Sequence, residues 1–283
     1  MSLNIGILES SRNAAANPLL NDYPTSTIAY SLRKLRSAYT GFCITVIRSS
    51  DNTTQDIGFV NNVLDTATLL TFVGLSNGSV VKWYDQSGNG NNASAISLTN
   101  VNNPKIVISG VLVTQNGKPS VNFIGIGLGF LTQFSSLVNI SLYLIGKANS
   151  TATAGPMIGE LPPGGSGPIM GHIGSSYDIQ CNTVSNSIKQ NITAAGTATT
   201  NFEIINLYWT GSQVSTVYIN NTNIPISTSS TYTTGTLTLR AIGVYGNFLQ
   251  TIGYISEIVL YRLDQLTNRT GINANINSYY TIF

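Results

Sequence analysis

Few side chains in this sequence could do chemistry, and they are scattered. The one histidine, His172, cannot form a histidine-rich metal site alone, and as a general base it would need a nucleophile and an orienting group. Asp178 and Cys181 follow a few residues later, but their spacing identifies no catalytic triad. Cys43 and Cys181 are too few for a disulfide framework, so we expect two free thiols. The simplest interpretation of His172 is an ordinary strand or loop residue.

The 11 carboxylates of the chain are also dispersed. Asp85 stands in a turn rich in Asn and Gly, where an aspartate most often accepts hydrogen bonds from local backbone amides. Glu160 precedes a Pro/Gly-rich loop, and the sequence assigns it no role. Asp51 and Asp56 offer two carboxylates to calcium, but without an EF-hand pattern. We expect no cofactor and no metal site, and calcium binding stays an open alternative.

Charge is scarce along the whole chain. Only 8% of the residues are charged, against about 25% in an ordinary soluble domain, and the net charge is +2. This excludes a polybasic protein that binds nucleic acid or a membrane surface. Hydrophobic residues make up 42%, enough to bury a sizeable core, which excludes general disorder. No apolar run approaches the ~20 residues that span a bilayer, and the start lacks the apolar core of a signal peptide.

The periodicity of apolar residues changes from helical to alternating along the chain. Apolar side chains at helical spacing predict helices over residues 25–39 and 60–72, and a short helix or strand within 264–280. Alternation, as in Ile140, Leu142 and Leu144, predicts strands elsewhere. The other expected strands are Phe42–Arg48, Val80–Tyr84, Phe202–Trp209, Val214–Asn220, Thr236–Ile242 and Tyr254–Arg262. Many short strands between Gly/Asn/Ser turns favour one antiparallel sandwich domain over residues 25–283, preceded by an N-terminal arm over residues 1–24.

Several motifs occur in a characteristic order. They are Ala29–Gly41, Arg48–Asn52, Gln55–Gly58 and Trp83–Asn91, the last containing the loop residues Asp85, Gln86, Ser87, Gly88 and Asn89. This succession resembles the catalytic-domain family of fungal α-L-arabinofuranosidase B, and phage and bacterial proteins with the same concanavalin A-like, laminin-G-like sandwich. The resemblance covers about residues 29–124 and implies an all-β jelly roll with a few short helices. It also implies a structural role for Glu257, because related sandwiches keep a structural glutamate there.

The resemblance places the family's two catalytic carboxylates in runs that carry none here. The nucleophilic glutamate would fall in residues 167–175 and the acid/base aspartate in residues 241–247, and neither run contains Asp or Glu. A retaining glycosidase needs two carboxyl groups about 5 Å apart. We therefore expect no catalytic residues and no enzyme activity.

The expected function is a non-enzymatic structural or adhesion protein of a phage virion, such as a capsid decoration, head-fibre or tail component. Its arm would dock on other virion proteins, the protein would form a homo-oligomer, and it would be made in the host cytoplasm. Tyr84, Trp209 and Tyr245 are candidate contacts for host-surface glycans, or else core residues. The alternatives are an α-L-arabinofuranosidase-like glycoside hydrolase and a free carbohydrate-binding module.

Overall fold

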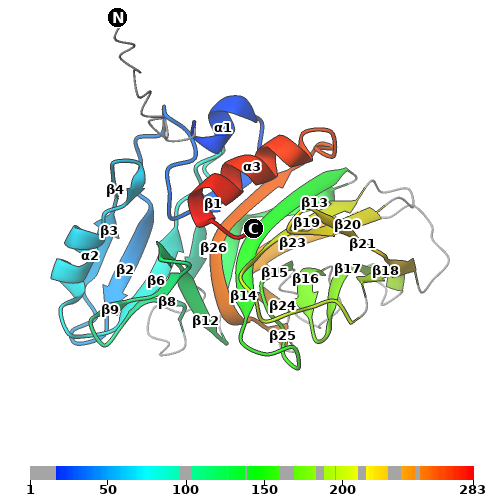
Figure 1. The fold of residues 1–283 in the computed structure, drawn as a ribbon. Helices are drawn as coiled ribbons and strands as arrows, with labels where there is room; N and C mark the ends of the chain where they lie inside the picture. The colour runs from blue at the N-terminus through cyan, green and yellow to red at the C-terminus, as the bar shows by residue number, and fades with distance from the viewer. Residues whose placement is uncertain are drawn as a thin grey trace, which may run out of the picture.

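Two layers of antiparallel strands pack face to face in this protein (Figure 1). The computed structural model describes residues 17–95, 103–125, 127–137, 139–159, 169–182, 188–194, 196–209, 215–228, 237–245 and 249–283. The prediction of an all-β antiparallel sandwich is confirmed.

One layer is built around the long strand β26 (Ile252–Tyr261). Strand β26 pairs with β1 and β12 along one side and with β14 along the other, and β19, β20 and β21 follow in turn. The bounds of these strands are β1 (Ile28–Ser31), β12 (Val121–Ile124), β14 (Ile140–Ala148), β19 (Glu203–Trp209), β20 (Ser215–Ile219) and β21 (Thr222–Ile224).

The second layer is a longer series of pairings, in the order β3, β2, β6, β7, β13, β23, β15, β16, β17, β18 and β22. Strand β8 pairs with both β6 and β12, and so connects the two layers. The bounds are β2 (Ile44–Arg48), β3 (Thr54–Ile57), β6 (Gly78–Trp83), β7 (Ala93–Ala95), β8 (Lys105–Ile108), β9 (Val111–Leu112), β13 (Leu128–Leu137), β15 (Met157–Gly159), β16 (Ile169–Ile173), β17 (Ser176–Asn182), β18 (Ile188–Ala194), β22 (Ser227–Thr228) and β23 (Leu237–Ile242). Three small hairpins are β4 (Phe59–Val60) with β5 (Val63–Leu64), β10 (Thr114–Gln115) with β11 (Lys118–Pro119), and β24 (Val244–Tyr245) with β25 (Leu249–Gln250).

Successive residues of β14 belong to two different hydrophobic clusters. Leu142 and Leu144 lie in the main core between the layers, whereas Tyr143 and Ile145 lie in a second cluster on the outer face. Helix α3 (Arg269–Tyr280) covers that outer face, as Figure 1 shows in red. Because both faces of β14 are covered, its residues are buried at almost every position.

The helix expected over residues 25–39 is wrong. Residues 28–31 instead form β1, which pairs antiparallel with β26, so that Ile28 lies opposite Leu260 and Ser31 opposite Glu257. Ile28, Leu32 and Leu35 of the expected helical stripe are buried, but they lie on β1 and on the irregular chain that follows it. Pairing with a strand more than 200 residues away overrides the local helical pattern, which a short sequence window cannot detect.

The second expected helix begins later than predicted. Residues 59–64 form the β4–β5 hairpin, whose turn residues Asn61 and Asn62 have positive φ angles of 51° and 65°. Helix α2 (Thr66–Val73) starts only after Asp65, whose carboxylate accepts a hydrogen bond from the backbone N–H of Thr68 at 3.0 Å. Asparagine tolerates the left-handed conformation, and aspartate is a favoured N-cap residue, so both features follow from residue type.

Part of the expected N-terminal arm is packed on the domain. Residues 1–16 lie outside the described part of the chain. From Asn17 onward the segment is in place, and helix α1 (Leu19–Asp22) contacts α3 (Figure 1). Leu19 and Leu20 are buried in the outer cluster beside that helix. The helical alternative for the end of the chain is the one observed.

Candidate functional site

The loop after β6 is fixed by the carboxylate of Asp85. Its Oδ1 accepts hydrogen bonds from the backbone N–H groups of Ala29 and Ser87, both at 2.9 Å. Its Oδ2 accepts from the Ser87 hydroxyl at 2.7 Å and from the Asn91 N–H at 3.0 Å. Asp85 is 4% exposed, so it binds the chain itself and presents no free oxygen for catalysis.

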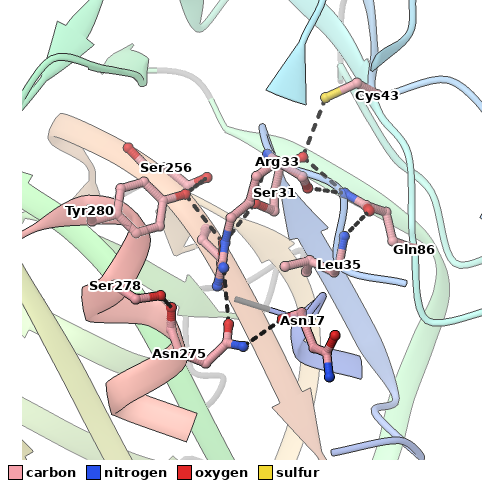
Figure 2. A network of polar contacts seen from close by, with 11 residues as sticks. Asn17, Ser31, Arg33, Leu35, Cys43, Gln86, Ser256, Asn275, Ser278 and Tyr280 are labelled. Carbon is pink, nitrogen blue, oxygen red and sulfur yellow. Dashed lines mark hydrogen bonds and ion pairs between the residues drawn. The ribbon is translucent and has the colours of Figure 1, made fainter. Parts of the chain in front are cut away.

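Two amide side chains of the same loop reach the segment that contains β1. The Gln86 Nε2 donates to the carbonyls of Ser31 and Arg33, both at 3.0 Å, and its Oε1 accepts from Leu35 N–H at 2.8 Å. The Asn89 Nδ2 donates to the carbonyls of residues 26 and 27. The loop that carries the family resemblance thus holds the N-terminal strand in place, as Figure 2 shows for Gln86.

A buried ion pair lies on the other side of that segment. The Arg33 Nε and Nη2 donate to the Glu257 carboxylate at 2.8 and 2.9 Å, and the Ser31 hydroxyl donates to Glu257 Oε2 at 2.7 Å. Arg33 Nη1 donates to the Asn275 side chain at 3.0 Å (Figure 2). The Tyr280 hydroxyl donates to Glu257 Oε2 at 3.3 Å. Burial lowers the pKa of Arg33, but the attraction and hydrogen bonding of Glu257, together with the effect of Tyr280 and Tyr279, raise that pKa by more in sum, so the guanidinium stays charged. Glu257 is fully occupied by these partners, which agrees with the structural role that the resemblance implies.

A second buried carboxylate has a different environment. Glu203, at the start of β19, is 4% exposed and has no cationic partner among the described residues. Thr199 donates to its Oε1 at 2.8 Å, and the Tyr177 hydroxyl donates to its Oε2. Burial raises the pKa of Glu203 above its ordinary value, and these two hydrogen bonds lower the pKa by less. A carboxyl group that favours its protonated form has the property a general acid requires.

His172 is connected to Glu203 by Tyr177, which packs against the His172 ring and donates a hydrogen bond to Glu203. The centroids of the His172 and Tyr177 rings are 5.4 Å apart, and the His172 Nε2 lies 2.6 Å from the Gly174 carbonyl. The other ring nitrogen lies against Gly155, where a Cβ would be only 2.3 Å from it. Burial lowers the pKa of His172, so the imidazole is neutral when it donates to Gly174. The expected ordinary histidine is therefore part of a polar cluster, comprising the buried residues His172, Tyr177 and Glu203 and the partly buried Thr199.

One member of this polar cluster, His172, lies in residues 167–175, the first of the two runs that the resemblance assigns to catalysis. Strand β16, which falls in the run expected to carry the nucleophile, contacts β19, where Glu203 lies. On the neighbouring β17, the backbone of Asp178 pairs with Gly171 of β16. Nothing is described of the Asp178 side chain, and Glu160 follows Gly159 just outside the described residues. The three acids Glu160, Asp178 and Glu203 thus belong to β15, β17 and β19 or follow them directly.

The sequence analysis overlooked Glu203 as a candidate. Its signal was weak but present, because Glu203 is the only charged residue in the strand Glu203–Trp209 and that strand is otherwise almost wholly apolar. A carboxylate at the end of a fully buried strand needs a compensating partner or a raised pKa.

The three aromatic candidates for glycan contact are placed differently. Trp209 has no exposed surface and lies in the main core, so its ring faces no solvent. Tyr84 is partly exposed, with Phe42 beside it at a ring distance of 6.0 Å and its hydroxyl 3.1 Å from Asp56. Tyr245 lies in β24, and nothing is described of its side chain. Glycan contact by Tyr84 and Tyr245 stays a prediction.

Neither a metal-binding cluster nor a membrane-spanning helix occurs in the described part of the chain. No three His, Cys, Asp or Glu side chains there lie close enough to hold a metal ion together. None of the described helices combines the length and apolar character that crossing a bilayer requires. The thiol of Cys43 is free and buried, and burial raises its pKa well above the ordinary value.

Comparisons with known proteins confirm the predicted resemblance. A family model for the catalytic domain of α-L-arabinofuranosidase B matches residues 21–119. An arabinofuranosidase complexed with arabinofuranosyl-α-1,2-xylobiose is 17% identical with a TM-score of 0.61, over 93% of this chain and 65% of that one. A mutant GH54 α-L-arabinofuranosidase soaked with 4-nitrophenyl α-L-arabinofuranoside is 16% identical, with the same TM-score and coverage. The chain therefore spans just under two thirds of the length of these structures, and no curated protein matches it.

These findings correct the expected function. The prediction of a non-enzymatic virion protein is wrong, because the matching family is that of a catalytic domain and the similar structures are arabinofuranosidases with substrates or an inhibitor. The virion and capsid assignments gain no support, and the findings favour the alternative, an arabinofuranosidase-like glycoside hydrolase. The prediction inspected only two short aligned runs for carboxylates and left the other acidic residues of the chain out of the test. The expectations about partners and location depended on the virion role and stay predictions.

Proposed function

We propose that this protein is a glycoside hydrolase acting on α-L-arabinofuranosides, with Glu203 as its general acid. The observation that supports this most directly is a buried glutamate with a raised pKa, held by Tyr177 and Thr199 beside the strand β16. The resemblance to arabinofuranosidase catalytic domains supplies the substrate class.

The chemistry requires a second carboxyl group. In a retaining mechanism one carboxylate attacks the anomeric carbon, while the other, still protonated, gives its proton to the leaving oxygen; water then releases the sugar. Glu203 suits the proton-donating role, because burial favours its protonated form. Asp178 and Glu160, which lie on or directly after neighbouring strands, are the two acids we assign as alternatives for the nucleophile.

Hydrolysis of an aryl α-L-arabinofuranoside tests this proposal. We expect wild-type turnover, and a fall in kcat of about 10²- to 10⁴-fold in Glu203→Gln when the leaving group is a poor one that needs protonation. Activated leaving groups need less acid catalysis, so the loss should shrink with nitrophenyl substrates. Asp22→Asn, which removes an exposed carboxylate of α1, is the matched control and should keep full activity.

The nucleophile is identified with the same assay. Either Asp178→Asn or Glu160→Gln should abolish turnover, and azide should restore it as a glycosyl azide product. Sugar binding without turnover by the wild-type protein would overturn the hydrolase proposal. Turnover that is insensitive to Glu203→Gln with every leaving group would keep the hydrolase and remove Glu203 from its mechanism.

A further inference from the structure

A cavity of about 210 Å³ is lined by none of the residues of the Glu203 cluster. It lies where the segment after β1, the β4–β5 hairpin and helix α3 meet, and no described acidic side chain lines it. The lining residues that matter for recognition are Arg33, Lys34, Asn61, Asn62, Ser278 and Tyr279. Its volume is below the ~300 Å³ at which pockets for drug-sized molecules begin, so it suits a ligand of one small ring.

Positive charge gathers around this cavity. The Arg33 Cζ lies 5.3 Å from the centroid of the Tyr279 ring, and the Lys118 Nζ lies 4.6 Å from the same ring. Lys34 lines the cavity as well. Two of the chain's 13 basic residues therefore line the cavity, although only 8% of all residues are charged. Glu257 balances the charge of Arg33, and Lys34 gives the cavity a positive excess.

Arg33 is held in place and still has hydrogen atoms to donate. A guanidinium has five N–H donors. Two nitrogens, Nε and Nη2, each donate one bond to Glu257, and Nη1 donates one to Asn275, as Figure 2 shows for Asn275. One N–H therefore remains on each terminal nitrogen. Because Glu257 and Asn275 already fix the group, a ligand would meet donors that need no reordering.

The ammonium of Lys34 is available in the same way. Among the described residues it forms neither an ion pair nor a hydrogen bond, and its side chain is only partly buried. A guanidinium and an ammonium that line the same cavity suit a carboxylate group. The exposed side chains of Asn61, Asn62 and Ser278 offer amide and hydroxyl groups that suit sugar hydroxyls.

We propose that the cavity lined by Arg33, Lys34 and Tyr279 binds a single carboxylate-bearing sugar, a hexuronate, either free or as a unit of a glycan. The site is built from elements other than those around Glu203, so it does not depend on the hydrolase proposal. Its carboxylate lies against Arg33 and Lys34, and its hydroxyls face the Asn61–Asn62 turn and Ser278.

Calorimetric titration with galacturonate, and with uncharged galactose as the matched sugar, tests the proposal. We expect galacturonate to bind at least about tenfold more tightly than galactose, because hydrogen bonds to a charged group are the stronger ones. Binding should weaken as salt is raised from low to physiological ionic strength. Equal affinity for the two sugars would overturn the proposal, and so would inorganic phosphate binding as tightly as galacturonate, since that indicates a general anion site.

Two variants separate the charge from the cavity. Lys34→Gln should weaken galacturonate binding about tenfold or more and leave galactose unaffected, whereas Lys147→Gln, which removes a charge from β14, should change neither. Ser278→Phe should fill the cavity and abolish binding at unchanged charge. Lys34→Gln or Ser278→Phe with wild-type affinity would contradict the proposal. A wild-type circular dichroism spectrum and melting temperature show that each variant is folded, and neither readout depends on hydrolysis.

Discussion

At the scale of single residues, two buried titratable groups at one site prefer their uncharged forms. Burial raises the pKa of Glu203 above 4.5 and lowers the pKa of His172 below 6.5. Both pKa shifts favour the uncharged form of the group, because a charged group in this buried cluster would lose its hydration. Tyr177 lies between the two groups, hydrogen-bonded to one and packed against the ring of the other.

Glu203 should make the stability of the fold depend on pH. Its pKa is higher in the folded than in the unfolded chain, so its stabilising contribution is present below pH 4.5 and is lost as the pH rises through the folded pKa. Glu203→Gln does not titrate. Its free energy of unfolding, measured in urea between pH 4 and 8, should therefore rise relative to wild type with increasing pH.

Ala274→Ser, a substitution at an exposed position of α3 that removes no titratable group, serves as the control for this titration and should show no such trend. A difference between Glu203→Gln and wild type that stays constant from pH 4 to 8 would show that Glu203 has the same pKa in the folded and unfolded chains.

Asp85 and Glu203 show what sequence could and could not predict at this scale. The role of Asp85 followed from its Asn- and Gly-rich turn, because its partners Ser87 and Asn91 are close in sequence. The partners of Glu203 are Thr199, which is close in sequence, and Tyr177, which lies 26 residues away on another strand. The apolar strand that follows Glu203 gives a weak local sign of its burial, but a short sequence window cannot identify Tyr177 as its partner.

At the scale of elements, the loop after β6 acts as the attachment of β1. Asp85, Gln86 and Asn89 all bond to backbone groups of residues 26–35. That segment has few regular bonds of its own, because it is a short strand followed by irregular chain. Buried backbone groups must be paired, and the loop supplies the partners.

Removing the Asp85 carboxylate should therefore destabilise β1 as well as the loop after β6. Asp85→Ala leaves the N–H groups of Ala29, Ser87 and Asn91 without their acceptor. We expect the free energy of unfolding in urea to fall by about 3 kcal/mol or more, since bonds to a charged group are worth ~1.5–3 kcal/mol each. Hydrogen exchange of the Ala29 amide should accelerate with it.

Asp22→Ala is the matched control, because Asp22 is exposed and should leave both stability and exchange at the wild-type level. Unchanged protection of Ala29 in Asp85→Ala would mean that pairing between β1 and β26 alone holds the strand.

Helices and strands could be predicted from the sequence where neighbouring residues determine the backbone conformation. The strands expected at Phe202–Trp209 and Val214–Asn220 are observed as β19 and β20, which pair antiparallel with Asn206 opposite Tyr218. The helical stripe in residues 25–39 failed, because Ile28, Leu32 and Leu35 are buried on β1 and on the irregular chain that follows it. A stripe of apolar residues indicates which side chains are buried. Whether the backbone is a helix or a strand depends on partners that are distant in sequence.

At the scale of the whole molecule, two hydrophobic clusters share the same strands. Along β14 and β26, neighbouring residues point alternately into the main core and toward α3. For example, Ile258 and Leu260 belong to the main core, and Val259 between them belongs to the outer cluster. The same strands contribute one face to each cluster. If one cluster loses its packing, one face of these strands becomes exposed to water, and the other cluster is weakened.

The two clusters should therefore unfold together. Ile276→Ala in α3 should lower the free energy of unfolding by about 2–5 kcal/mol, as expected for truncating a fully buried isoleucine. Both tryptophans lie in the main core, so tryptophan fluorescence reports on the cluster that the substitution does not touch. Its denaturation midpoint should fall as far as that of far-ultraviolet circular dichroism.

Ala274→Ser, at an exposed position of the same helix, should leave both midpoints close to the wild-type values. Tryptophan fluorescence that keeps its wild-type midpoint in Ile276→Ala would show that α3 detaches independently of the sandwich.

The pairing of β1 with β26 has a consequence for synthesis on the ribosome. Arg33 and Glu257 are separated by 224 positions, and translation at ~5–20 residues per second leaves roughly 10–45 s between them. During that interval the first strand has emerged without its hydrogen-bonding neighbour, and its apolar side chains stay accessible to other nascent chains. Folding of this protein is thus completed late, and a chaperone that shields the early segment would raise the yield of native molecules.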